Sequence, residues 1–357
     1  MVTMDTSVES VTVYPDRARV TRRGSLELEA GSHRIVIDNL PAAIVPESLR
    51  VSGRGSAGAR LLSVRSERVF LKHPAEVRTA ELEAALEERN KNLRIAYLKM
   101  KKDLEAAAKM QQNLLPKSPP EAPNARLAWL LQPSSFVAGD IFNVFRLNEE
   151  HLGLYILDVS GHGVPAAMLS VTLSKLLSPL PGRDHLLKKF IPNPPHYELA
   201  SCSEVAMKLN QSFQQETNDD MYFTMIYAKM NYHTGQLRWV QAGHPPPIHI
   251  PKGKKPRTIG EGGYPIGLIP DADYQEEKID LKKGDRLFFY SDGVTETANE
   301  RGELFSQERL CDLLKSLEEK PLTENPPAIL KELKAWRGGK NDFEDDVTMI
   351  LLEFDPK

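Results

Sequence analysis

The chain of 357 residues has 46 Lys and Arg against 49 Asp and Glu, and 41% of its residues are hydrophobic. This composition is typical of a folded globular protein of more than one domain, and the net charge of -3 argues against nucleic-acid binding. The absence of an apolar run of about 18 residues, of a secretory leader and of paired cysteines predicts a cytoplasmic protein with no membrane span, disulfide or zinc cluster.

Residues 1–74 are predicted to form a small β-rich module. Short alternating stretches at Val11–Tyr14, Ser25–Leu28 and Arg34–Ile37 are separated by turn residues. Residues 48–64 offer two more strands around a glycine-rich turn. No catalytic constellation occurs in this region, so we interpret it as a sensory or regulatory module.

Residues 75–115 are predicted to form a coiled-coil linker helix, because they are rich in Glu, Lys, Arg, Ala and Leu and contain no Gly or Pro. Steps of four and three place apolar residues on one stripe of this helix, as in a coiled-coil seam. Asn90 and Gln111 are polar positions on the same stripe that could fix its register. An amphipathic helix packed on its own domain is the alternative, but the helix's length and charge favour a homodimer. The apolar seam positions are Leu86, Leu93, Tyr97, Met100, Leu104, Ala107 and Leu114.

Residues 116–357 are predicted to form one mixed α/β domain, which begins where prolines end the helix. Strand-like runs follow one another directly in its middle, so hairpins and an antiparallel sheet fit better than a regular alternation of strands and helices. The segment "NYHTGQLRWV" is predicted to be a hairpin with Gly235 in its turn.

Aspartates recur where apolar strands of this domain begin or end. Asp140 precedes one strand, Asp158 and Asp292 end two others, and Asp345 and Asp346 open the last. Each alone is most simply a turn residue or a helix cap. Gathered at one sheet edge, however, they would need protons or cations, and oxygen ligands without Cys or His select Mg²⁺ or Mn²⁺. Two such ions about 3.5–4 Å apart can clamp a phosphoryl group and activate a water.

Glycines beside these acids fit the same interpretation. Gly161, Gly163 and Gly293 would allow close approach of the backbone and a ligand. The turn after Asp158 leads into a predicted helix N-terminus, which attracts anions.

Seven ordered segments carry a resemblance to a known family. They are "VAGDIFNVFRL", "LDVSGHGVPAAML", "YFTMIYAKM", "WVQAGHPPP", "GLIPDADYQ", "GDRLFFYSDGVTETAN" and "EDDVTMI". In this order they resemble the SpoIIE/RsbU-type branch of the PPM metal-dependent serine/threonine phosphatases, from about Met110 to Phe354. The resemblance implies an α-β-β-α sandwich with two Mn²⁺ or Mg²⁺ ions at one edge of its sheets. It also implies hydrolysis of phosphoserine or phosphothreonine on a STAS-domain anti-sigma-factor antagonist in bacterial partner switching.

Residue by residue, the resemblance assigns the metal site. Asp140, Asp158, Asp292 and Asp345 match the metal acids, with Asp158 as the expected bridging ligand, and the carbonyl of Val159 could assist. The nucleophile would be a metal-bound water, so no Ser, Cys or His needs to attack.

Two departures from the family pattern leave these acids in place. Ala138 stands where the family has the first glycine of a pair, and Ser306 stands where a glycine usually follows Phe305. We therefore expect an active enzyme. Asp346, the neighbour of a metal acid, is expected to orient or cap rather than to ligate.

Candidates for substrate contact lie in two turns. Gly161, His162 and Gly163 follow Asp158 and could meet the substrate phosphate, or could form an ordinary exposed turn. His244 precedes three prolines, where it could contact substrate or simply shape a rigid loop. The basic segment 251–257 could meet an acidic phosphoprotein, or be a solvated hairpin loop.

Two further resemblances concern the segments before the catalytic domain. "KMQQNLLP", at 109–116, is similar to the helix that enters this family's phosphatase domain, which implies coupling through a dimeric coiled coil. Residues 10–41 resemble the N-terminal domain of mucoidy-inhibitor-A-like proteins, a likeness that brings no activity or ligand.

Two other functions remain open at this point. One is a signalling scaffold that binds a phosphoprotein without turnover, and the other is a different two-metal enzyme such as a nucleotide phosphohydrolase. The order of the motifs favours the protein phosphatase.

Overall fold

The computed structural model describes residues 1–14, 17–38, 40–41, 44–54, 60–67, 74–179, 186–216 and 221–357. Contacts divide the chain into two compact units, Met1–Lys91 and Asn92–Lys357, and the boundary falls within the long helix α1, Pro74–Gln112. Each unit is described by itself. Of the helices in the described parts of the chain, none combines the length and the apolar character needed to cross a bilayer.

In the described part of the N-terminal unit the strands form two small sheets. Strand β2 (Ser7–Val13) pairs antiparallel with β3 (Ala18–Arg23), and β1 (Val2–Thr3) pairs parallel with β4 (Ile35–Val36). A short helix, η1, covers Pro46–Ser48. The predicted strands at 11–14 and 34–37 therefore overlap β2 and β4.

Two strand predictions in this unit are wrong. Ser25–Leu28 is not a strand, and neither are the described parts of 48–64, residues 48–54 and 60–64. The alternating pattern in these segments is short and finds no partner strand, and β structure depends on such pairing more than on local preference. The glycine-rich turn at 55–59 lies outside the described residues.

Helix α1 has two different environments along its length. Leu86, Leu93, Tyr97 and Met100, on the predicted seam, have 53–68% of their surface exposed. Gln111, on the same stripe near the end of the helix, is instead buried against the rest of the second unit. The interpretation of Gln111 as a polar seam position is therefore wrong, because its own domain covers this last turn.

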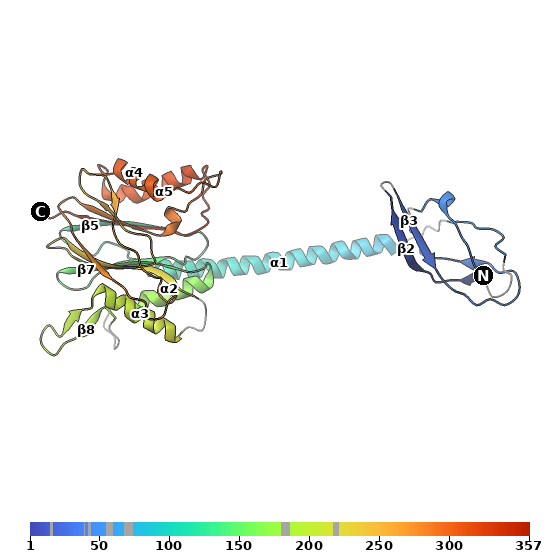
Figure 1. Ribbon diagram of the computed structural model, residues 1–357, viewed down its shortest axis with the longest axis horizontal. Coiled ribbons are helices and arrows are strands. Elements are labelled where there is room, and N and C mark those ends of the chain that lie inside the picture. The colour runs from blue at the N-terminus through green and yellow to red at the C-terminus, as the bar shows by residue number, and fades with distance from the viewer. Residues whose placement is uncertain are drawn as a thin grey trace. The chain divides into compact units, whose positions relative to one another are not determined.

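The second unit is built from two five-stranded antiparallel sheets with helices outside them (Figure 1). The strand orders are β14-β11-β10-β7-β6 and β13-β12-β15-β16-β5. The strands of the first sheet are β6 (Ile141–Arg146), β7 (His151–Val159), β10 (Phe223–Asn231), β11 (Gln236–Ala242) and β14 (Glu276–Asp280). Those of the second are β5 (Ala125–Gln132), β12 (Ile248–Ile250), β13 (Arg257–Thr258), β15 (Arg286–Tyr290) and β16 (Val347–Phe354).

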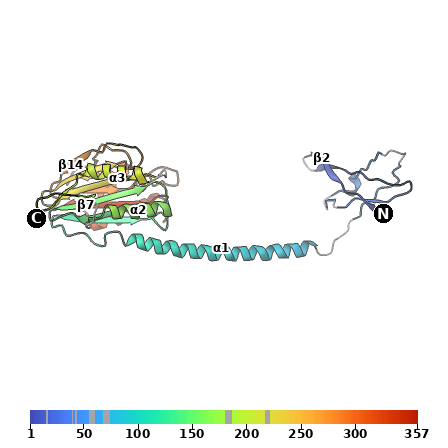
Figure 2. The same ribbon diagram turned by 90° about the horizontal axis from the view of Figure 1, so that it is seen from below.

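Helices cover the outer face of each sheet, as Figure 2 shows from a second direction for α2 and α3. Helices α2 (Val164–Leu176) and α3 (Cys202–Glu216) pack on the first sheet, and α4 (Gln307–Ser316) and α5 (Asn325–Trp336) pack on the second. The hairpin β8 (Lys188–Phe190) and β9 (Tyr197–Leu199) and the short helices η2 (Asp292–Val294) and η3 (Leu322–Glu324) complete the unit. This is the α-β-β-α sandwich that the family resemblance implies, so the fold class is confirmed.

The core lies in three apolar layers, one between the sheets and one beneath each helix pair. Alternate residues of one strand serve two of these layers: Ile156 faces the other sheet, whereas Tyr155 and Leu157 face α2 and α3. The predicted hairpin also forms, since β10 and β11 pair around Gly235, whose φ of 80° suits glycine.

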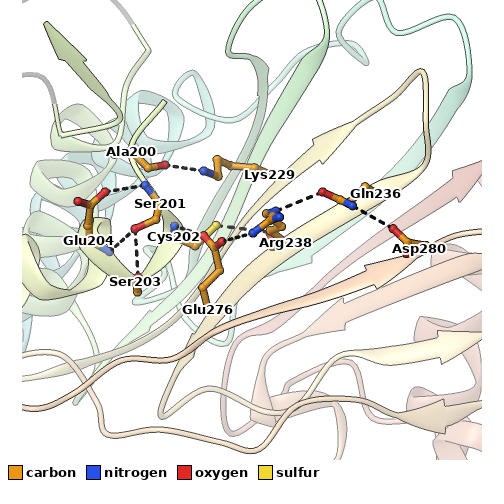
Figure 3. Close-up of polar contacts among 10 residues, drawn as sticks. All are labelled: Ala200, Ser201, Cys202, Ser203, Glu204, Lys229, Gln236, Arg238, Glu276 and Asp280. Carbon is orange, nitrogen blue, oxygen red and sulfur yellow. Dashed lines mark hydrogen bonds and ion pairs between the residues drawn. The ribbon is translucent and has the colours of Figure 1, made fainter. Parts of the chain in front are cut away.

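Helix α3 is fixed to the first sheet by the polar contacts in Figure 3. The amide of Ser201 donates to Glu204 Oε2 at 2.8 Å, and the amide of Glu204 donates to Ser201 Oγ at 3.2 Å, which forms a capping box. Glu276 on β14 accepts from the amide of Cys202 at 2.5 Å and from Arg238 Nη1 at 3.0 Å. Both cysteines, Cys202 and Cys311, are buried and free, as expected of small core residues.

Candidate active site

Strand pairing places the candidate acids at paired strand ends. In β6 and β7, Ile141 lies opposite Leu157, so continuing this register brings Asp140 opposite Asp158. In β15 and β16, Tyr290 lies opposite Met349, so the segments carrying Asp292 and Asp345 adjoin in the same way. Each sheet therefore contributes two of the predicted acids from neighbouring strands.

Hydrogen bonds join these two pairs of strand ends. Thr348 Oγ1 on β16 donates to Asp140 Oδ2 at 2.5 Å, which links the second sheet to the first. The carboxylate of Asp346 accepts from the amides of Ser134 and Gly139, both at 2.7 Å, and from the amide of Asp140 at 3.2 Å. Asp346 thus orients the loop that carries Asp140, as the sequence predicts.

The pKa values of the four candidate ligands are raised, first by burial and then by the charges of neighbouring aspartates. Burial and the charges of Asp158 and Asp346 hold the pKa of Asp140 well above its ordinary value. Burial raises the pKa of Asp158 to about 8, reinforced by Asp292 and Asp345. Burial and the charge of Asp345 raise the pKa of Asp292 to about 6. The pKa of Asp345 is also raised, mainly by burial.

Charge effects therefore run from Asp140 to Asp158 and from Asp158 to Asp292 and Asp345. Buried like charges are unfavourable unless protons or cations neutralise them. The arrangement is therefore suited to binding positive charge.

The donor set fits Mg²⁺ or Mn²⁺. Among the residues that the structure describes, no three Asp, Glu, His or Cys side chains form a ligand cluster around one point. Mg²⁺ in proteins typically binds one or two carboxylates and keeps several waters, so pairs of acids suffice. A backbone oxygen is also near, because a Cβ built on Gly139, beside Asp140, would lie 3.3 Å from the carbonyl oxygen of Val159.

The glycines act in two different ways. Gly161 and Gly163 have φ angles of 87° and 81°, so they give the turn after Asp158 a left-handed backbone before α2. A Cβ on Gly293 would lie 2.1 Å from the carbonyl oxygen of Asp346. Glycine at 293 thus permits the close approach of η2 to the segment that leads into β16.

The two predicted substrate-contact histidines differ in position. His162 is exposed, and its charge acts to lower the pKa of Asp345 against the effect of burial, so the two residues lie near each other. His244 is only 2% exposed, and its Nδ1 lies 2.7 Å from Oγ1 of Thr224, the residue opposite Asp158. Burial lowers the pKa of His244 to about 3. This burial favours the interpretation in which His244 shapes a rigid loop, and its contact with substrate stays a prediction.

The basic segment 251–257 lies away from the acids. It connects β12 to β13, and Ile250 at its start pairs with Arg286, the first residue of β15. Asp292 follows the opposite end of β15. The structure thus favours the simpler interpretation of this segment as a solvated hairpin loop.

Sequence reasoning missed the part played by Thr348 and Thr224. Thr348 lies two residues after Asp346, so the period of a strand places both on one face. This alternation is a sequence signal from which the position of Thr348 could have been predicted. No such signal exists for Thr224, because only the pairing of β10 with β7 brings it beside Asp158.

An antiparallel sandwich with acids from both sheets at one edge is the architecture of a PP2C-type protein phosphatase. The SiaA-PP2C domain of Pseudomonas aeruginosa shares this fold, with a TM-score of 0.60 and 21% identity over 73% of this chain and 99% of that domain. The RsbU and RsbW domains of Rv1364c from Mycobacterium tuberculosis also share it, with a TM-score of 0.53 and 22% identity over 68% of this chain and 62% of that one.

Residues 148–355 match the family model of stage II sporulation protein E (SpoIIE), and the chain belongs to this family. Residues 11–112 match a second model, described as an N-terminal domain of unknown function. Phosphoserine phosphatase RsbU of Bacillus subtilis is 29% identical over 74% of this chain and 73% of its own length. Phosphoserine phosphatase RsbP of the same species is 24% identical over 71% of this chain, which matches only 58% of the length of RsbP.

We predict that Asp158→Asn stabilises the protein when EDTA removes divalent metal. The pKa of this carboxyl is raised on folding, so its contribution to stability is present below the unfolded pKa near 4 and is lost as the pH rises through about 8. The variant should therefore melt at least about 3 °C above wild type at pH 8.5, with a smaller difference at pH 5. Thermal unfolding by circular dichroism measures this, and a variant less stable than wild type at pH 8.5 would contradict it.

Proposed function

We propose that this chain is a cytoplasmic, Mn²⁺- or Mg²⁺-dependent serine/threonine phosphatase that dephosphorylates a STAS-domain anti-sigma-factor antagonist in partner switching. The observation that carries the proposal is that neighbouring strand ends of both sheets of a PP2C-type sandwich carry aspartates, and that Thr348 joins the two sheets at Asp140. The names of the relatives RsbU and RsbP, both phosphoserine phosphatases, support the substrate class.

In this proposal Asp140, Asp158, Asp292 and Asp345 would hold two ions, with Asp158 shared between them and the carbonyl of Val159 as a further oxygen. Such ions, when bound, would place positive charge on the phosphoryl oxygens and lower the pKa of a water. Without cations, the raised pKa values of Asp140 and Asp158 favour their protonated forms. The positive charge of bound ions would favour the ionised carboxylates, which are the form that binds metal.

Other residues of the chain hold this arrangement and receive the substrate. Thr348 and Asp346 fix the side chain and the backbone of Asp140, so this ligand needs little reorganisation on binding. Gly161 and Gly163 lead the chain into the N-terminus of α2, whose amides favour an anionic group. His162 is exposed and its charge acts on Asp345, so it is the side chain proposed to contact a phosphoprotein.

The two alternative functions are less well supported. A scaffold that binds without turnover would not need a full set of coupled acids. A nucleotide phosphohydrolase does not account for the match of residues 148–355 to the SpoIIE family.

Regulation is proposed to act through a homodimer of α1. Leu86, Leu93, Tyr97 and Met100 form an exposed stripe on this helix, and Leu104 continues it with partial burial. An exposed apolar stripe of this spacing is suited to pairing with a second copy. The proposed organisation is thus a regulatory module at 1–74, a linker helix at 75–115 and a phosphatase domain at 116–357.

We predict that Asp158→Asn and Asp292→Asn each reduce phosphate release by more than about 100-fold, because each removes charge that holds the ions. Release from a phosphoserine peptide and from an aryl phosphate is measured with Mn²⁺, Mg²⁺ or EDTA. Asp312→Asn is the matched control, since Asp312 is exposed on α4. Full activity of Asp158→Asn would refute the metal assignment, whereas partner binding without phosphate release by wild type would favour the scaffold.

Leu93→Glu is predicted to convert a dimer into a monomer, because it puts a carboxylate into the proposed seam. Lys102→Glu is the control: Lys102 is exposed and lies nine residues on, which is half a turn away around the helix. Light scattering coupled to gel filtration measures the mass of each variant. A dimeric Leu93→Glu protein with unchanged turnover would argue against regulation through this stripe.

A further inference from the structure

A pocket of about 320 Å³ lies between the first sheet and the hairpin β8–β9. Its volume is within the range of sites that bind small organic molecules. His151, the first residue of β7, and Asn231, the last residue of β10, both line it. Asp158 lies near the other end of β7. The pocket is therefore separate from the candidate active site.

One face of the first sheet changes from apolar to cationic along its strands. Tyr227 and Val240 lie opposite each other on the face that packs beneath α2 and α3. Two residues away along each strand, the same face carries Lys229 and Arg238, again opposite each other. Lys278 on β14 lies opposite Arg238, so three cationic residues lie side by side across three strands. Like charges at opposed positions are destabilising, and a bound anion would relieve their repulsion.

The carboxylates near this row leave one cation without an ion pair. Glu276 Oε1 accepts from Arg238 Nη1 at 3.0 Å, as Figure 3 shows. Glu198, in the wall of the pocket, has a lysine partner on its own hairpin. Lys229 Nζ donates to the carbonyl oxygen of Ala200 at 2.6 Å, but no carboxylate of the described residues lies within ion-pair distance of it. Because an ammonium group has three donors, Lys229 can offer a ligand its charge and two hydrogen bonds.

Neutral polar groups complete this side of the pocket. Gln236 Oε1 accepts from Arg238 Nε at 3.2 Å, which fixes the guanidinium group, and Gln236 Nε2 donates to the edge strand β14. Asn231 lies opposite His151 in the next row of the sheet. Burial lowers the pKa of His151, and the charge of Lys229 acts in the same direction. The imidazole of His151 is thus sensitive to charge at Lys229.

The hairpin supplies an apolar wall. Tyr197, Pro195 and Leu199 line the pocket, and Leu199 also packs on the core beneath α3. An aromatic ring offers a planar surface against which a ring or another apolar group can pack. The pocket thus combines cationic groups with an apolar wall, as the recognition of an organic anion requires.

We propose that this pocket is a second ligand site of the chain, which binds a small organic anion. The carboxylate or phosphate of the ligand contacts Lys229 and Arg238, and its apolar body packs on Tyr197. A bounded volume of this size suits a small molecule better than an extended acidic peptide. The inference goes beyond the proposed phosphatase activity and does not depend on it.

The test uses the full chain in EDTA, which keeps divalent ions from the candidate active site. Benzoate and phenylphosphonate are the probes for the two head groups, and benzamide is the neutral analogue of benzoate. Binding is followed by NMR of isotope-labelled imidazole rings, in which the signal of His151 is identified by its loss in His151→Gln. At least one anion should shift this signal in a saturable way, and benzamide should bind about 10-fold or more weakly.

Two variants test whether the anion occupies this pocket. Lys229→Met removes the ammonium group. Asn231→Asp adds a negative charge beside it but keeps the side-chain oxygen that accepts from two amides of the β10–β11 turn. Each should weaken binding about 10-fold or more. Asn299→Asp is the matched control outside the pocket, because the side-chain oxygen of Asn299 also accepts from two backbone amides, and it should bind as wild type.

Several results would overturn the proposal. If neither anion shifts the His151 signal, the pocket binds no such ligand, and if benzamide binds as well as benzoate, charge is not recognised. Wild-type affinity in Asn231→Asp would place the ligand elsewhere, and this variant decides the question even if Lys229→Met does not fold. Binding of a glutamate-rich peptide without binding of either probe would identify the surface as a protein contact instead.

Discussion

The site depends on the hydrogen bonds by which β16 and its leading residues hold the Asp140 loop. Asp346 binds the loop backbone, and Thr348 binds the Asp140 side chain, so the edge of the second sheet determines where a ligand of the first sheet lies. Apolar packing between the sheets brings these edges together but has no directional preference. The hydrogen bonds supply that direction, and they make a single site out of acids from two separate sheets.

Holding these acids together opposes folding, and the surrounding core compensates. Asp140 is buried and the carboxyls raise one another's pKa values, which is a destabilising arrangement without bound cations. Immediately behind the acids, Phe142 and Phe289 lie fully buried between the sheets. The free energy gained by this apolar packing offsets the repulsion among the aspartates at the edge of the sheets. A divalent ion bound between the aspartates would remove that repulsion. Metal affinity and unfavourable electrostatics in the free protein are thus two consequences of one arrangement.

Much of the fold and of the ligand set follows from local sequence features. Apolar strands that end in Asp158 or Asp292 are recognisable from alternation and from the acid itself. The strand expected at Ser25–Leu28 does not form, because strand pairing is not local. The burial of His244 is likewise not visible in the local sequence, because it depends on the tertiary packing around the loop after β11. The prediction that Gln111 is a polar seam position is wrong for a different reason. Helical spacing shows that Gln111 shares a stripe with Leu104, but it does not show whether a second copy or the chain's own domain covers that stripe.

That shared stripe links the two environments of α1. Tyr97 and Met100 are exposed on it, whereas Gln111 lies on the same stripe one to two heptads later and is bound to Ala138. The two bonds to Ala138 involve both a donor and an acceptor, so they fix the rotation of this last turn against the loop. One helical stripe thus packs on its own domain at one end and, in the proposed dimer, would be covered by a second copy at the other.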